Sequence, residues 1–107
     1  MPRQPHQPGP VQISEPQPGV LYSLDAVVHL TGVSRRNILV YCKSGLVRPA
    51  SDPREEPISF DDEAIYSIRR IEHLRSVHGV NLAGIRMIFD LLNQLRRLEN
   101  EMRFFRL

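Results

Sequence analysis

The sequence predicts a mainly α-helical fold with a single small core, in which two short helices, a β-hairpin and two longer helices follow one another. Three observations support this order. Residues that favour helix N-caps stand directly before four stretches with helical apolar periodicity. Glycines follow the first three of these stretches. A proline-containing segment of two short β-type runs separates the second stretch from the third. With 107 residues, 41% of them hydrophobic, one domain is expected.

The first two helices are short and lie close together. The first is expected to begin after Ser23 and to end at Gly32, and the second to begin after Ser34 and to end at Gly45. The second helix has Val33, Ile38, Tyr41 and Cys42 on one side, which leaves Arg35, Arg36, Asn37 and Lys43 largely free. This pattern predicts a helix-turn-helix in which the second helix can recognise DNA.

The segment from Val47 to Phe60 is expected to form a β-hairpin wing. Its two predicted strands are 47–49 and 58–60, and the polar tip between them contains Pro53 and Pro57. A wing beside a helix-turn-helix would extend a nucleic-acid interface.

The third and fourth helices follow the wing. Asp61 is expected to cap the third, which ends near Gly79, and Asn81 to cap the fourth. The fourth helix then carries heptad-spaced apolar residues: Ile88, Leu91, Leu95, Leu98, Met102 and Phe105. A heptad helix this short needs a partner surface, so it either pairs with a second copy or folds back on the domain. We expect a homodimer.

The sequence therefore divides into three parts. Residues 1–19 are rich in proline and are expected to be a disordered tail. Residues 20–90 form the winged helix-turn-helix domain, and residues 91–107 form a dimerisation helix that continues from the last domain helix.

Several function classes are disfavoured. No apolar stretch reaches the roughly 20 residues that span a bilayer, so we expect a cytoplasmic protein without a membrane partner. Cys42 has no partner for an internal disulfide and is expected to be a small buried residue. His73 and His78 fall on different faces of one helix, and His29 adds no ligand spacing, so no metal is predicted. No phosphate loop or nucleophile motif is present, so neither catalytic residues nor cofactors are expected, and the protein is not predicted to be an enzyme.

The order of elements, together with the spacing of Tyr41, Gly45, Leu46, Val47 and Pro49, resembles the MerR superfamily of winged helix-turn-helix proteins over residues 22–106. Within it, residues 79–88 and the leucine-rich helix after them are similar to the heat-shock repressor group HspR. Residues 60–64 and 98–106 are similar to the chaperone-modulator group CbpM. Both groups are linked to the Hsp70 chaperone system, so the resemblance implies a regulator of chaperone genes or a chaperone partner.

A DNA-binding regulator needs base contacts from the start of its second helix and cations against phosphate. The second helix and the wing supply side chains for base contacts and cations for phosphate. The resemblance implies that Tyr41 contacts a phosphate through its hydroxyl. A dimer would bind double-stranded DNA at a pseudo-palindromic operator. The candidate DNA-binding residues are Ser34, Arg35, Arg36, Asn37, Tyr41, Lys43, Arg48 and Arg54.

Two features depart from this pattern. The superfamily usually has arginines at the positions held here by Leu39 and Ile58. The wing tip also contains Asp52, Glu55 and Glu56, which phosphate would repel at short range. Fewer cationic contacts would weaken DNA binding.

The alternative function is therefore that of a CbpM-like modulator, which would bind a J-domain co-chaperone or the Hsp70 chaperone with little or no DNA binding. The candidate partner-binding residues are Asp61, Asp62, Glu63, Ile65 and Tyr66. The competing interpretation is that Asp61 caps its helix, the next two acids complement the helix dipole, and Ile65 belongs to the core.

Overall fold

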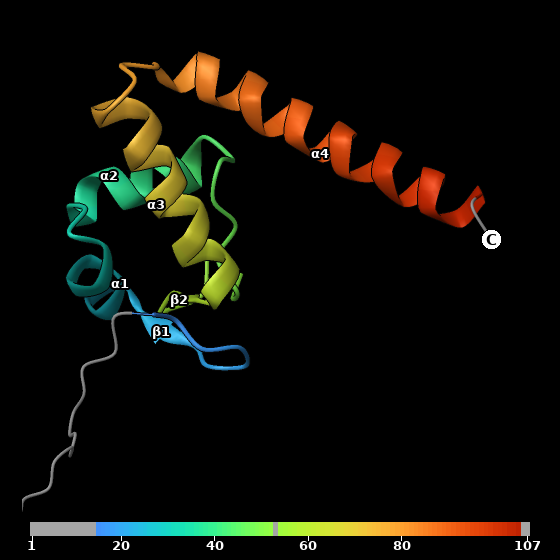
Figure 1. The fold of residues 1–107 in the computed structure, drawn as a ribbon. Helices are drawn as coiled ribbons and strands as arrows, with labels where there is room; N and C mark the ends of the chain where they lie inside the picture. Colours follow the sequence, from blue (N-terminus) through green and yellow to red (C-terminus); the bar gives the residue numbers. More distant parts are fainter. Residues whose placement is uncertain (1–14, 53, 106–107) are drawn as a thin grey trace, which may run out of the picture.

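The computed structural model describes residues 15–52 and 54–105, and confirms the mainly helical winged helix-turn-helix fold (Figure 1). Most of the domain surrounds one long helix, α3. The elements in chain order are β1 (Tyr22–Ser23), α1 (Leu24–Thr31), α2 (Arg35–Lys43), β2 (Ser59–Phe60), α3 (Asp62–Ser76) and α4 (Leu82–Phe105). None of the helices in the described ranges is both long and apolar enough to cross a membrane.

All four predicted N-caps are present. The side chains of Ser23, Ser34 and Asp61 accept hydrogen bonds from backbone N–H groups three residues further on, at 2.9–3.1 Å. Asn81 Oδ1 accepts one from Gly84 N–H at 2.8 Å. Each cap satisfies a donor that the first helical turn would otherwise leave unpaired. Helix starts were therefore predictable from local sequence.

The core lies where α3 meets α1, α2, β2 and the first turns of α4. Both short helices and the wing loop contribute side chains to it, but α3 contributes most. The buried apolar residues are Val27, Val33, Ile38, Tyr41, Leu46, Val47, Phe60, Ala64, Ile65, Ile68, Ile71 and Ile85. Since α2 and the wing pack on the same helix, the core fixes their relative orientation.

The strand pairing differs from the predicted hairpin. In the described residues β2 pairs antiparallel with β1, Tyr22 opposite Phe60, and residues 47–49 form no strand. The two arms of the wing share one backbone hydrogen bond, from Ala50 N–H to the Ser59 carbonyl at 2.8 Å. Pro49 has no N–H to extend this ladder, and the regular pairing of β2 is with the segment before α1.

The last residues of the predicted tail, 15–19, lie within the described residues. Residues 1–14 lie outside the described residues, but Pro16 is buried and Glu15 forms an ion pair with Arg69 on α3, with 3.5 Å between Oε1 and Nη1. The backbone N–H of Gln17 donates to the Tyr22 hydroxyl at 3.0 Å. These contacts join Glu15 and Gln17 to the domain.

The last helix, α4, is uninterrupted across the boundary predicted at residue 90. Its first turns join the core through Ile85, with Leu82 and Phe89 partly buried beside it. The remainder projects away from the domain (Figure 1). At 1.5 Å per residue, a helix of 24 residues is roughly 36 Å long. Much of α4 is therefore available to a partner.

Candidate nucleic-acid interface

The turn between α1 and α2 is held by local hydrogen bonds. Gly32 adopts a left-handed conformation at φ 72°, and its N–H donates to the Val28 carbonyl at 2.8 Å. Thr31 Oγ1 donates to the Val27 carbonyl at 2.7 Å and accepts from Val33 N–H at 3.2 Å. The turn therefore aims the N-terminus of α2 outward at a fixed angle to α1.

The C-terminus of α2 has a Schellman motif. The N–H of Gly45, at φ 82°, donates to the Cys42 carbonyl at 3.1 Å, and that of Leu46 donates to the Tyr41 carbonyl at 3.0 Å. Arg86 of α4 donates to the Ser44 carbonyl. Both ends of the helix are thus fixed to the domain.

The side chains of α2 divide into a buried and an outward face. Ile38 and Tyr41 are fully buried, and Asn37 and Cys42 are partly buried. The outward face, as the term is used below, consists of the exposed residues Arg35, Arg36, Leu39, Val40 and Lys43. It carries three cations, and α2 itself contains no acidic residue. This face has the charge that a phosphate backbone attracts.

Arg35 is the one cation of the outward face with a described partner, Asp25 of α1. Their side chains are 57% and 77% exposed, respectively. Ion pairs this exposed contribute about 0–1 kcal/mol, so a phosphate group could replace Asp25 at little cost. Arg35 thus remains a usable contact.

Tyr41 is not at the surface where the family resemblance placed it. Its side chain is fully buried, and its hydroxyl donates to Glu72 Oε2 at 2.5 Å and accepts from Arg75 Nη1 at 2.7 Å. The Arg75 guanidinium also lies 5.9 Å from the ring centroid, within cation–π range. Burial, and next the hydrogen bond to Glu72, raise the pKa of Tyr41 above 10.0. The expected phosphate contact is therefore corrected: this hydroxyl joins α2 to α3.

The wing contributes fewer free cations than expected. Arg48 is exposed, whereas Arg54 forms an ion pair with Asp52 at 3.2 Å and donates a second hydrogen bond to it through Nε. Hydrogen bonds from Arg54 hold the pKa of Asp52 below its ordinary value. The tip therefore neutralises part of its own charge. Ile58 is partly buried against the core.

Of the five residues predicted for partner binding, Asp61, Glu63 and Tyr66 line one groove of about 590 Å³, whereas Asp62 and Ile65 do not line it. Asp61 is occupied as the N-cap of α3, and Ile65 is fully buried in the core, so its prediction as an apolar anchor is wrong. Asp62 and Glu63 lie in the first turn of α3, where the helix dipole favours carboxylates. Tyr66 is 47% exposed, and its hydroxyl donates to Glu15 at 3.4 Å.

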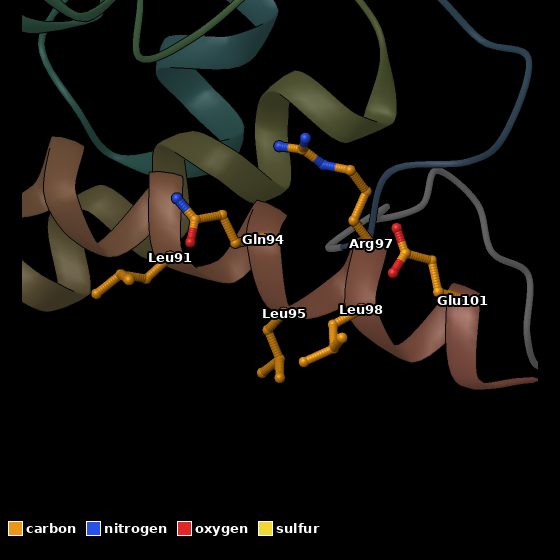
Figure 2. Close-up of a pocket in the computed structure, with 6 residues that line it drawn as sticks. All are labelled: Leu91, Gln94, Leu95, Arg97, Leu98 and Glu101. Carbon is orange, nitrogen blue, oxygen red and sulfur yellow. The ribbon is translucent and has the colours of Figure 1, made fainter.

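The heptad residues after Ile88, which is itself partly buried, share one exposed side of α4. Figure 2 shows that Leu95 and Leu98 point away from the body of the domain, while Arg97 lies on another side of the helix. A shallow groove of about 470 Å³ follows this stretch of α4. The exposed apolar residues here are Leu91, Leu95, Leu98, Met102 and Phe105, between 51% and 82% exposed. We call these five residues the α4 seam.

Comparison with known proteins agrees with this geometry. The model of the MerR HTH family of regulatory proteins matches residues 22–92. The chain belongs to the MerR family. It is also 31% identical over 91 residues to a Streptomyces coelicolor protein named "Putative heat shock protein HspR"; the match covers 84% of this chain and 58% of that protein. The chain thus spans less than two thirds of this relative's length.

In this MerR-family protein, sequence patterns did not reveal two residues that position the interface. Glu72 and Arg75 of α3 contact Tyr41 across 31 and 34 positions. Their i, i+3 spacing, with 4.0 Å between Oε2 and Nη1, was the available signal, but many surface pairs share it. At Leu39 the sequence indicates only a missing cation, whereas the structure shows an exposed apolar side chain.

The cysteine and histidines have structural surroundings. Burial raises the pKa of the Cys42 thiol from 9.0 to about 11, so the side chain stays a neutral thiol near pH 7. His73 and His78 are not separated as predicted: their rings lie edge to face with centroids 5.3 Å apart, because α3 ends at Ser76 and the chain then turns. No cluster of three or more His, Cys, Asp or Glu suited to a metal occurs within the described ranges.

Proposed function

We propose that this MerR-family protein is a transcriptional regulator that inserts the N-terminal half of α2 into the major groove of double-stranded DNA. The outward face of α2 carries this proposal. This face contains three cations, α2 has no acidic residue, and both ends of the helix are fixed to the domain. A rigid, cationic, exposed helix is what a helix-turn-helix presents to DNA.

The contacts can be assigned from the geometry. Arg35, Arg36 and Asn37 lie in the first turn of α2, where side chains reach base edges or phosphates. The Ser34 oxygen accepts from Asn37 N–H, which leaves its hydroxyl proton free to donate to phosphate. Lys43 and Arg48 are exposed cations suited to the flanking backbone.

Two proposed contacts change. Arg54 would have to exchange Asp52 for phosphate, so we assign it a minor part. Tyr41 supports α2 from within the core and makes no contact in this proposal.

We further propose a homodimer formed through the α4 seam. The five exposed apolar side chains follow a heptad spacing, and burying them against a second copy would remove them from water. Two α2 helices related by a two-fold axis would then recognise a pseudo-palindromic operator.

The link to heat shock and chaperone control rests on the similarity to the HspR protein and is part of the proposal. The alternative, binding of a J-domain co-chaperone or the Hsp70 chaperone, retains Asp62, Glu63 and Tyr66 as accessible side chains. Glu63 and Tyr66 line a groove of about 590 Å³, but Arg48, Arg70 and Arg96 line it too. Its charge is therefore mixed, whereas α2 contains no acidic residue.

Fluorescence anisotropy tests the DNA-binding proposal. The protein is titrated into labelled duplexes that tile the region upstream of its own operon, at two salt concentrations, with an unrelated duplex for comparison. We expect saturable, selective binding that persists at the higher salt concentration. Weak binding to every duplex that vanishes with salt would contradict the proposal, and a purified J-domain protein would then be titrated instead.

A charge-matched pair of variants locates the contacts. Arg35→Ala/Arg36→Ala should reduce the slope of log affinity against log salt by about one unit per lost phosphate contact. Arg70→Ala/Arg103→Ala removes two exposed arginines from α3 and α4 and should leave the slope nearly unchanged. Equal effects of the two double variants would indicate a general charge effect and no specific role for α2.

A further inference from the structure

We infer that Leu39, with Val40 beside it, contacts thymine methyl groups in the major groove and sets the sequence preference of this protein. The inference rests on the proposed DNA binding and deepens it. It assigns a specificity-determining role to two side chains that carry no charge and no hydrogen-bonding group.

Neither side chain belongs to the hydrophobic core. Leu39 is 42% exposed and Val40 is 40% exposed, whereas the core is filled from the opposite side of α2 by Ile38 and Tyr41. Successive helical residues are 100° apart, so residues four positions apart differ by only about 40° and Leu39 lies between Arg35 and Lys43 on the outward face. Two apolar side chains therefore occupy the surface that would meet a ligand.

Their surroundings indicate a polyanion with an apolar feature. On a helix, residues three and four positions apart are neighbours, so Arg35, Arg36 and Lys43 all surround Leu39. No hydrogen bond or ion pair joins Arg36 or Lys43 to another side chain within the described ranges. If these cations bind the phosphate backbones that border the major groove, Leu39 between them would face the base edges.

Thymine is the base whose major-groove edge fits the apolar side chain of Leu39. In the major groove it alone presents a methyl group, and the other base edges present hydrogen-bond donors and acceptors. An apolar side chain pressed on a donor or acceptor leaves that group without its water, whereas a methyl group gains from the same contact. The position opposite Leu39 in each half-site should therefore be thymine.

The test uses duplexes enriched from a random-sequence library by repeated selection on the wild-type protein. Each thymine of the enriched duplex is then replaced singly by deoxyuridine, which removes only the methyl group. Anisotropy titrations at fixed salt measure the affinity of wild type, Leu39→Ala and Val40→Ala. Leu21→Ala, at a 61% exposed leucine before β1, is the matched control.

At one thymine in each half-site we expect wild type and Leu21→Ala to lose affinity about fourfold on deoxyuridine replacement, the factor for one buried carbon. Leu39→Ala should bind the thymine and deoxyuridine duplexes equally well at that position, and Val40→Ala should lose sensitivity at an adjacent one. Circular dichroism should show the same helix content in all variants.

Two results would overturn the inference, and they differ. If a duplex is enriched but deoxyuridine has no effect, or has the same effect in Leu39→Ala as in wild type, DNA recognition stands and thymine contact by Leu39 is wrong. If no duplex is enriched at all, the proposed sequence-specific DNA binding fails, and the inference fails with it.

Discussion

The hydroxyl of Tyr41 on α2 donates a hydrogen bond to Glu72 Oε2 on α3 at 2.5 Å. The Tyr41 hydroxyl oxygen also accepts a hydrogen bond from Arg75 Nη1 at 2.7 Å. One phenol group therefore bridges two charged side chains and joins α2 to α3, the central helix of the core. Tyr41 therefore acts on DNA binding through the position of α2.

Tyr41→Phe should reduce the free energy of unfolding by about 1 kcal/mol, because Glu72 and Arg75 lose a partner in a partly buried site. Urea denaturation measures this loss, and DNA affinity of the folded variant should change little. Tyr22→Phe, whose hydroxyl accepts one exposed hydrogen bond, should be milder. Unchanged stability with a lower salt slope would return Tyr41 to the phosphate contacts.

Two glycines with positive φ should differ in their tolerance of alanine. Gly32→Ala should cost about 1–2 kcal/mol, since a Cβ there is strained by φ 72° but meets no atom within 4 Å. Gly45→Ala should cost more, because its Cβ would also lie 3.2 Å from Arg86 Nη2. Thermal or urea unfolding of both variants provides the comparison. Adding Arg86→Ala should remove the difference if the clash is its cause.

The α4 seam predicts the oligomeric state. Leu95→Glu should convert a dimer into a monomer without unfolding the domain, because Leu95 is 51% exposed and lies outside the core. Sedimentation velocity measures the mass and circular dichroism the fold. Asn100→Glu introduces the same charge at an exposed position of α4 outside both the seam and the groove, and should leave the dimer intact. A wild-type protein that is already monomeric would contradict dimerisation.

Stability should fall at alkaline pH partly through Cys42. Burial raises its pKa from 9.0 to about 11 in the folded state, so the folded protein holds this proton more tightly than the unfolded chain. The contribution of Cys42 to the free energy of unfolding is complete below pH 9 and is lost as the pH rises toward 11. The free energy then falls by at most about 1.4 kcal/mol per pH unit. Urea unfolding at pH 8, 9.5 and 11 should show a shallower decline in Cys42→Ala than in wild type. Equal declines would contradict this assignment.

The candidate site was partly predictable. The sequence placed Tyr41 on the same side of its helix as Ile38, which indicated burial, while the family resemblance assigned its hydroxyl to phosphate. Burial prevailed because Glu72 and Arg75 satisfy that hydroxyl inside the domain. Ile65 shows the same competition between core packing and an expected surface contact.

By itself the sequence determined where the helices begin and that Arg35, Arg36 and Lys43 of α2 are exposed. These depend on local effects: a cap such as Ser34 bonds the N–H three residues away, and a glycine such as Gly45 permits the left-handed turn. Only the tertiary structure decided the partner of β2, the partners of Tyr41 and the ion pair of Glu15 with Arg69 on α3. Each of these joins residues more than thirty positions apart, and their spacing along the chain does not encode which distant groups will meet.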